Sequence, residues 1–291
     1  MLSGILFRRF NVVPNDSYKA INNWIIYLAL PAVSLKHLWH LEISQQLLGP
    51  AVSPIIVLAG SFVFVYLLDL KFHFDKATKG LLILASGLCN TSFIGFPLIK
   101  TYFGDEFIRI AVISDQMTFL LFSTIGLFVA SSYSSYNSLN IKSILLNLIK
   151  FPPLVVSILA LLLPSQIHFP TLDNLFTQLA STIAPLALFS IGLQIRISGW
   201  RNELGLMIPV FIYKLVLAPL LVLAYVLWSG FGHEYSQISV FESAMPVLMS
   251  LSILCERFQL KTELANLIIG ISILLGFIST FFWSLLLHQI F

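Results

Sequence analysis

The sequence predicts an all-α protein that crosses a membrane many times, and three observations support this prediction. Of the 291 residues, 58% are hydrophobic and only 10% are charged, whereas soluble domains carry about 25% charged residues. The mean hydropathy is +0.93. Long apolar runs follow one another along the whole chain and are separated by short polar connections. These properties exclude a soluble globular domain.

A helix needs about 20 apolar residues to cross a bilayer. Nine stretches reach this length, and the first ten residues hold only an amphipathic fragment. The predicted spans are 18–39, 49–69, 79–101, 107–130, 142–163, 171–194, 204–228, 236–256 and 264–290. The longest connection, SSYSSYNSLNIK at 131–142, is polar and lies mid-chain, which indicates a linker between two halves.

An internal repeat supports this division. A shift of 154 residues superposes Pro31 on Pro185 and brings the span at 79–101 over the one at 236–256. The halves are then 1–136 and 137–291, each with five spans. Because five is an odd number, the second half is inverted relative to the first, as in many transporters.

The repeat also indicates that the first helix is incomplete. The same shift moves the start of the span at 142–163 to a point before Met1. We therefore expect nine full spans and half of a tenth. Either the chain begins part-way through that helix or its start codon was assigned late.

The third span is interrupted by polar and helix-breaking residues. Asn90, Thr91 and Ser92 are followed by Gly95 and Pro97. Proline removes a backbone donor and glycine loosens a helix, and groups freed in lipid must be satisfied by protein, water or a ligand. A helix broken at mid-membrane is typical of the binding site of a secondary transporter.

A second break is expected in the corresponding span, at Met245 and Pro246. Half-helix N-termini carry unpaired amides and a partial positive charge, which suits a carboxylate. We expect Asn90, Thr91 and Ser92, with the amides around Gly95, to hold a substrate anion. Three further residues are expected to face them: Met245, Ser250 and Ser252.

A structural alternative is a kink whose polar groups bond only to neighbouring helices. Gly95 and Pro97 are expected to shape the break, and Pro31 and Pro185 to kink helices on the opposite wall of the site.

Charged residues within spans are functional candidates. Asp115 and Lys214 reach similar depths, about 12 and 15 Å from opposite ends of their spans. One hypothesis is that they form a pair. Another is that Asp115 takes up a coupling proton, and a static ion pair that only holds the bundle together is the third. Glu242 is a weaker proton candidate, near the mouth of the second break.

Three segments resemble motifs of the auxin efflux carrier family. CNTSFIGFPL at 89–98 resembles its asparagine-glycine-proline crossover signature. YLALPAVSL at 27–35 resembles its second-helix proline motif, and ESAMP at 242–246 its ninth-helix break. The similarity covers the whole chain except the missing start of the first helix.

The resemblance implies a ten-helix inverted-repeat carrier of small organic anions, a family that includes plant auxin carriers and bacterial malonate or malate permeases. It implies a scaffold at 1–48 and 142–196, and a mobile transport part at 49–130 and 203–290. Asn90 matches the family's binding asparagine. The second break departs from the pattern because it has no asparagine.

We therefore expect a secondary active carrier that works by alternating access in the bilayer. The alternatives are a non-transporting receptor and a structural membrane protein of the same fold. An enzyme is disfavoured because no nucleophile–base pair is visible. We expect no metal site or cofactor, no nucleic-acid partner, and H⁺ or Na⁺ as coupling ion. A homodimer through scaffold helices stays open.

Lysine and arginine residues set the orientation, because they gather in cytoplasmic loops. Eleven lie on the side of residues 1–19, and three, Lys36, Lys100 and Arg109, lie on the other. This predicts an external carboxyl terminus, and we expect location in the plasma membrane, the inner membrane of a bacterium.

Overall fold

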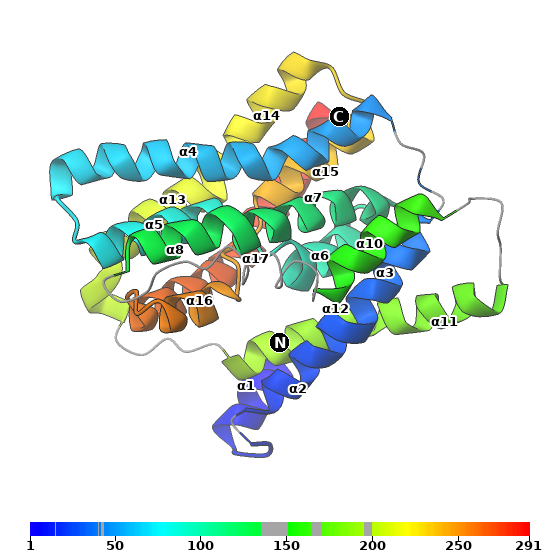
Figure 1. The fold of residues 1–291 in the computed structure, drawn as a ribbon, viewed down its shortest axis with the longest axis horizontal. Coiled ribbons are helices and arrows are strands. Elements are labelled where there is room, and N and C mark those ends of the chain that lie inside the picture. Colours follow the sequence, from blue (N-terminus) through cyan, green and yellow to red (C-terminus); the bar gives the residue numbers. More distant parts are fainter. Residues whose placement is uncertain (15, 40, 42–43, 135–150, 164–169, 195–199) are drawn as a thin grey trace.

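The structure is a computed structural model that describes residues 1–14, 16–39, 41, 44–134, 151–163, 170–194 and 200–291 (Figure 1). Helices make up nearly all of it. Within these residues the β-structure consists of one isolated antiparallel bridge, between Cys89 and Val247. The all-α prediction is therefore confirmed.

The elements of the first half follow the chain in short steps, several of them joined through π-helical or 3₁₀ turns. They are α1 (Leu2–Arg9), α2 (Ser17–Trp24), η1 (Ile25–Ala29), α3 (Leu30–Leu38), η2 (Gln45–Leu47), α4 (Leu48–Phe72), α5 (Lys76–Gly87), η3 (Thr91–Gly95), α6 (Phe96–Tyr102), η4 (Asp105–Phe107), α7 (Ile108–Leu121), η5 (Phe122–Gly126) and α8 (Leu127–Ser132).

The second half has the same character. Its elements are α10 (Pro152–Leu162), α11 (Pro170–Ser181), α12 (Ile183–Gln194), η6 (Trp200–Glu203), α13 (Leu204–Ile212), η7 (Tyr213–Leu217), α14 (Ala218–Ser229), α15 (His233–Ser243), α16 (Leu251–Arg257) and α17 (Thr262–Ile290). The predicted linker from 135 onward and the start of the span at 142–163 lie outside the described residues.

Among the described residues, five continuous helical segments are long and apolar enough to cross a membrane: Gln45–Phe72, Asp105–Ser132, Leu172–Gln194, Leu204–Ser229 and Thr262–Ile290. Each overlaps a span predicted from the sequence. The predicted spans at 79–101 and 236–256 are instead divided into two short helices each. The molecule is thus an integral, multi-pass membrane protein.

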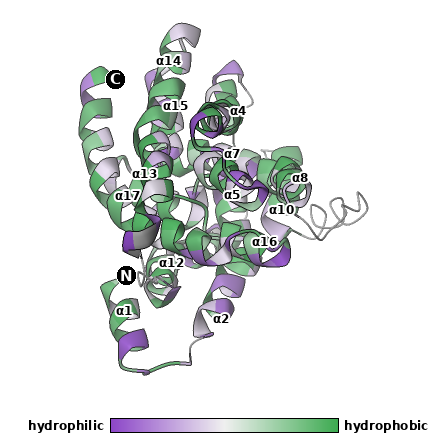
Figure 2. Cartoon of the chain, turned by 90° about the vertical axis from the view of Figure 1, so that its left-hand side faces the viewer, coloured by the Kyte–Doolittle hydropathy of each residue, from purple (hydrophilic) through white to green (hydrophobic). Residues whose placement is uncertain are grey.

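The outer surface of the bundle is apolar along the helices. Val63, Leu67 and Leu70 on α4 are about 60% exposed, and Phe282 on α17 is 62% exposed. Figure 2 shows hydrophobic residues along most helix lengths and hydrophilic ones gathered near helix ends, as on α2 and α16. A bilayer accepts this surface, because lipid chains replace water around it.

The amphipathic start of the chain forms α1, which packs closely on α12. A side chain at Gly4 would meet the Cα of Gly192 at 3.0 Å and the carbonyl oxygen of Phe189. Glycine on both helices therefore permits contact between their backbones, as small residues do at helix interfaces in membranes. The contact joins the first helix to a helix of the second half.

Candidate substrate site at two broken helices

The first break follows α5 directly. The helix ends at Gly87, and Leu88 is extended, with φ −111° and ψ 127°. The chain resumes as the π-helical turn η3 from Thr91, where the amide of Gly95 donates to the carbonyl of Asn90 at 3.1 Å. Pro97 is the second residue of α6, which continues directly from η3: the amide of Phe96 donates to the carbonyl of Thr91. The break therefore lies at Leu88–Asn90, inside the predicted span, and Gly95 and Pro97 lie in the helical structure that follows it.

The second break lies between α15 and α16. The helix ends at Ser243, and helical structure resumes at Leu251. The intervening residues include Pro246, whose ring would meet a side chain at position 276 at 3.1 Å. Gly276 therefore lets α17 approach the break closely.

The two breaks pair with each other through their backbones. The amide of Asn90 donates to the carbonyl of Pro246 at 2.9 Å, and the amide of Leu248 donates to that of Leu88 at 3.2 Å. The amide of Val247 donates to the hydroxyl of Ser272 on α17 at 3.2 Å. Groups freed by the broken helices are thus satisfied within the protein, as the membrane interior requires.

A cavity of about 670 Å³ adjoins this pairing. The breaks contribute Asn90, Thr91, Ser92, Phe93, Leu248, Met249, Ser250 and Ser252. The facing wall comes from α2, η1, α3 and α12 and includes Asn22, Asn23, Ile26, Leu30 and Gln194. Exposed side chains of Lys19, Asn23 and Glu256 lie at its mouth.

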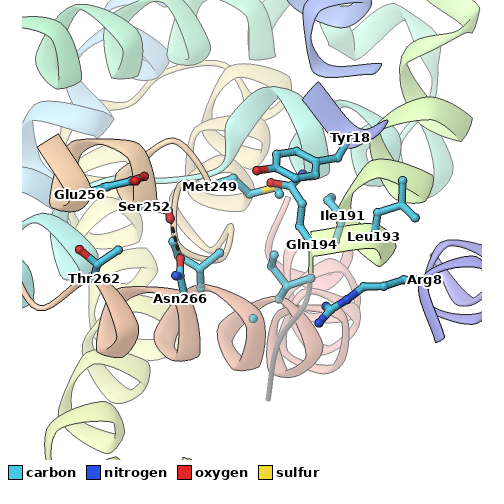
Figure 3. Close-up of a pocket in the computed structure, with 13 residues that line it drawn as sticks. Arg8, Tyr18, Ile191, Leu193, Gln194, Met249, Ser252, Glu256, Thr262 and Asn266 are labelled. Atoms are coloured by element: carbon cyan, nitrogen blue, oxygen red, sulfur yellow. Dashed lines mark hydrogen bonds between the residues drawn. The ribbon is translucent and has the colours of Figure 1, made fainter. Parts of the chain in front are cut away.

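A second pocket of about 400 Å³ continues from the mouth (Figure 3). It shares Tyr18, Gln194, Met249, Ser252 and Glu256 with the larger cavity, and Arg8 and Asn266 also line it. Figure 3 shows the side chain of Ser252 directed at Asn266, to which its hydroxyl donates at 2.6 Å. Ser252 therefore already has a partner in this conformation.

Asn90 is the unusual residue of the site. Its side chain lies at the floor of the cavity, is fully buried, and neither its amide nitrogen nor its oxygen has a hydrogen-bond partner among the described residues. Leaving a buried amide unpaired costs about 1–3 kcal/mol. Such a cost is typical of a functional position and does not arise from packing alone.

Asp115 lies beside the first break, on α7. Its carboxylate accepts a hydrogen bond from the Thr91 hydroxyl at 2.6 Å and another from Gln116 at 3.4 Å. The residue is 6% exposed and lines the cavity. The first break and α7 therefore present one acidic group to any molecule that enters.

The predicted pairing of Asp115 with Lys214 is absent from the structure. Lys214 is fully buried, and its ammonium donates to the sulfur of Cys89 at 2.6 Å. The ammonium thus lies beside the end of α5, and Cys89 also contacts the carbonyl of Ser243 at 3.7 Å, where α15 ends. A cation is favourable there because helix C-termini carry partial negative charge.

Four other predicted site residues lie away from the cavity. Met245 is fully buried in the apolar core. Gly95 faces the carboxyl group of Glu242. Pro31 continues a helical rod directly after η1 without a break, and Pro185 is an exposed residue in the first turn of α12. Proline in the first turn of a helix is tolerated, which accounts for Pro185.

The facing wall holds a polar network that sequence reasoning missed. The hydroxyl of Ser190 donates to the side-chain oxygen of Asn22 at 2.6 Å, and Gln194 donates to that hydroxyl at 3.1 Å. The signal was available, since the pair Asn22-Asn23 interrupts a predicted span. Adjacent amide side chains inside an apolar segment are energetically costly unless they form hydrogen bonds or bind a ligand.

Comparisons with known proteins agree with this architecture. A family described as membrane transport proteins matches residues 1–284. An uncharacterized transporter of Methanothermobacter thermautotrophicus is 25% identical over 99% of this chain and 95% of its own length. One of Methanocaldococcus jannaschii is 27% identical over 91% and 88%. The uncharacterized transporter YfdV of Escherichia coli is 25% identical over 96% and 91%.

The family match spans almost the entire sequence, and the relatives are matched along nearly their full lengths. The family and the names of the relatives indicate transport and not enzymatic catalysis. The chain therefore belongs to the membrane transport protein family, which is the auxin efflux carrier family that its crossover motif resembles.

Proposed function

We propose that the protein is a secondary active carrier that moves a small organic anion, such as a carboxylate, by alternating access. The observation that carries this proposal is the unpartnered amide of Asn90, buried at the floor of a cavity where two broken helices meet. A structural membrane protein has no use for such an arrangement, whereas a carrier needs polar groups that become satisfied only when substrate binds.

The lining of the cavity suits a carboxylate. Ser92 and Ser250 are partly exposed to it and offer hydroxyl donors, and the amide of Asn90 offers another once the floor opens slightly. Asn22 and Lys19 supply an amide and a positive charge from the facing wall and the mouth. The volume of about 670 Å³ lies within the range of about 300–1,000 Å³ for small-molecule sites.

Asp115 gives a reason for coupling to protons. An anionic substrate near Thr91 is repelled by the carboxylate that Thr91 holds. At an effective dielectric constant of about 20, two like charges 4 Å apart repel by about 4 kcal/mol. Protonation of Asp115 removes this cost, so we propose that substrate and a proton enter together. Sodium coupling is the alternative.

The division into parts follows the same proposal. The scaffold comprises 1–48 and 142–196, the transport part comprises 49–130 and 203–290, and the halves are inverted repeats. The distribution of cations supports a mouth at Lys19 on the cytoplasmic side and an external carboxyl terminus. At the opposite end, Asp105 pairs with Lys36 at 2.5 Å and with Lys100 at 2.9 Å, so this conformation faces the cytoplasm.

The test is uptake of labelled malonate, malate and indole-3-acetate into proteoliposomes, with and without imposed pH and sodium gradients. Saturable uptake that Asn90→Ala abolishes supports the proposal. Gln178→Ala serves as the matched control, because this exposed amide on α11 lies away from the cavity. Binding of an anion without uptake would favour a receptor of the same fold.

Stimulation by an inward proton gradient that Asp115→Asn removes supports proton coupling. Stimulation by sodium alone contradicts the role given to Asp115 but leaves the carrier function standing.

A further inference from the structure

Glu242 is a second buried group without a partner, and it does not face the anion cavity. It lies near the end of α15, is 2% exposed, and neither carboxyl oxygen has a hydrogen-bond partner among the described residues. Its carboxyl group lies against the backbone of η3, where a side chain at Gly95 would meet it at 2.7 Å. An ionised carboxylate in such a place is strongly unfavourable unless a positive charge accompanies it.

Glu242 lines a small cavity of its own, of about 10 Å³, between α4, α7 and α15. That volume matches a single water-sized species. Six hydroxyl groups line the same cavity: Ser53, Thr91, Ser114, Thr118, Ser239 and Ser243. A carboxyl group and six hydroxyl-bearing residues therefore border the same small space, together with Pro54, Val57 and Cys89.

Each of these hydroxyl groups already donates its proton in a hydrogen bond. Thr91 donates to Asp115, and the other five donate to backbone carbonyls at 2.6–3.0 Å. Their oxygens can therefore only accept a hydrogen bond or coordinate a cation. The cavity thus combines a carboxyl group with acceptor oxygens, and oxygen ligands of this kind suit a hard cation or a proton.

A buried lysine close to this cavity is already engaged with another residue. Cys89 lines the cavity together with Glu242, and Asp115 on α7 accepts a hydrogen bond from Thr91, which lines it too. Lys214, on η7, has its ammonium on the sulfur of Cys89. It forms no ion pair with Glu242 in the described part of the chain, so the carboxyl group is not neutralised by a protein cation.

We infer that Glu242 anchors a site for one small monovalent cation, a proton or a sodium ion, directly behind the two paired breaks. The use of that ion for transport rests on the proposed carrier function, but its binding does not. Thr91 lines both this cavity and the anion cavity and bonds to Asp115, so it connects the two sites physically. Occupation by the cation neutralises the charge beside η3, where the anion is proposed to bind.

The experiment measures the thermal unfolding midpoint of the purified full-length protein without any anion, so failure of transport cannot affect it. Sodium chloride is titrated against choline chloride at constant ionic strength, at several values between pH 5.5 and 9, for wild type and Glu242→Gln. Glu263→Gln is the matched control, because its carboxylate is exposed at the start of α17.

With sodium as the ion, the wild-type midpoint rises by roughly 2–5 °C when sodium is tenfold above its dissociation constant, and Glu242→Gln abolishes the rise. With a proton as the ion, sodium has no effect. The wild-type midpoint then falls as pH rises, because a bare carboxylate remains buried, and Glu242→Gln removes that dependence. Glu263→Gln behaves like wild type in both cases.

Ser239→Ala provides a second test that leaves the carboxyl group in place, in case Glu242→Gln fails to fold. Loss of one coordinating oxygen weakens a sodium response by several-fold and leaves a proton response nearly unchanged. A sodium or pH response that persists in Glu242→Gln overturns the assignment, and so does a wild type that responds to neither.

Discussion

Replacing Asn90 by leucine should stabilise the protein while it abolishes transport. Leucine has the same number and branching of side-chain heavy atoms as asparagine, so it fills the same space. In the structure both polar atoms of Asn90 are buried and unpaired. Removing them recovers a desolvation cost of about 1–3 kcal/mol, which corresponds to a rise of roughly 2–6 °C in the unfolding midpoint of a chain of this size.

The assay is thermal unfolding of the detergent-solubilised protein, and Thr91→Val is the matched control. Thr91 is the neighbouring residue, also buried, but its hydroxyl holds the Asp115 carboxylate at 2.6 Å. Its loss should lower the midpoint, because a hydrogen bond to a charged group contributes about 1.5–3 kcal/mol. A fall for Asn90→Leu as large as that for Thr91→Val would refute the reasoning, because it would mean that the asparagine amide is satisfied in the folded protein.

Three further predictions concern the rest of the chain. Asp75→Ala should destabilise α5 by about 1 kcal/mol, whereas Asp75→Asn keeps an oxygen for the Thr78 amide, which donates to Asp75 at 2.9 Å; thermal unfolding distinguishes them. Partial burial raises the pKa of Asp75, but the hydrogen bonds from Thr78 and the nearby charge of Lys261 together outweigh it and leave the pKa below its usual value. This contribution is therefore complete at neutral pH and is lost below about pH 4, and an acid titration of Asp75→Asn should lack that loss. Asp105→Asn should weaken the ion pair with Lys36, and because the pair is partly exposed its contribution to stability is about 0–1 kcal/mol. Amide hydrogen exchange around η4 should then increase up to fivefold. Unchanged exchange would mean that the ion pair does not hold this end of the protein closed. Gly192→Leu should prevent α1 from packing on α12, which a loss of monodisperse protein in size-exclusion chromatography would show.

Sequence reasoning located both breaks because their causes are local. Asn90, Pro97 and Pro246 indicate in the sequence that an apolar helix cannot continue. The backbone pairing between the breaks could not be predicted in this way, since it joins residues about 150 positions apart that share no side-chain signature. The five long spans could be predicted from the sequence as well, because length and apolarity define them.

The error over Lys214 has a geometric origin. Counting residues along a helix gives the depth of a side chain in the membrane but not the direction in which it points. Lys214 lies inside the π-helical turn η7, and the extra residue of such a turn rotates the remainder of the helix by about 100° around its axis. Pro219 lies two residues beyond this turn, but a count of depth takes no account of such a turn, so the direction of Lys214 was missed.

A π-helical turn also precedes Pro31. The turn η1 ends at Ala29, two residues before the proline, and η3 and η7 end at the same distance before Pro97 and Pro219. Because proline has no N–H, a carbonyl of the preceding turn loses its regular partner, and a wider turn accommodates this loss. A proline inside an apolar span therefore predicts a π-helical turn before it, and not necessarily a break.

The hydrogen bonds between the two breaks restrict how the protein can move. Separating Leu88 from Leu248, or Asn90 from Pro246, would strand backbone donors and acceptors in the least polar layer of the membrane, at a cost of several kcal/mol for each group. The four half-helices α5, α6, α15 and α16 should consequently travel as one rigid body. In the proposed carrier, the surface on which this body moves includes the contact of η3 and α6 with α12, and bulkier side chains at that contact should slow turnover without changing the affinity for substrate.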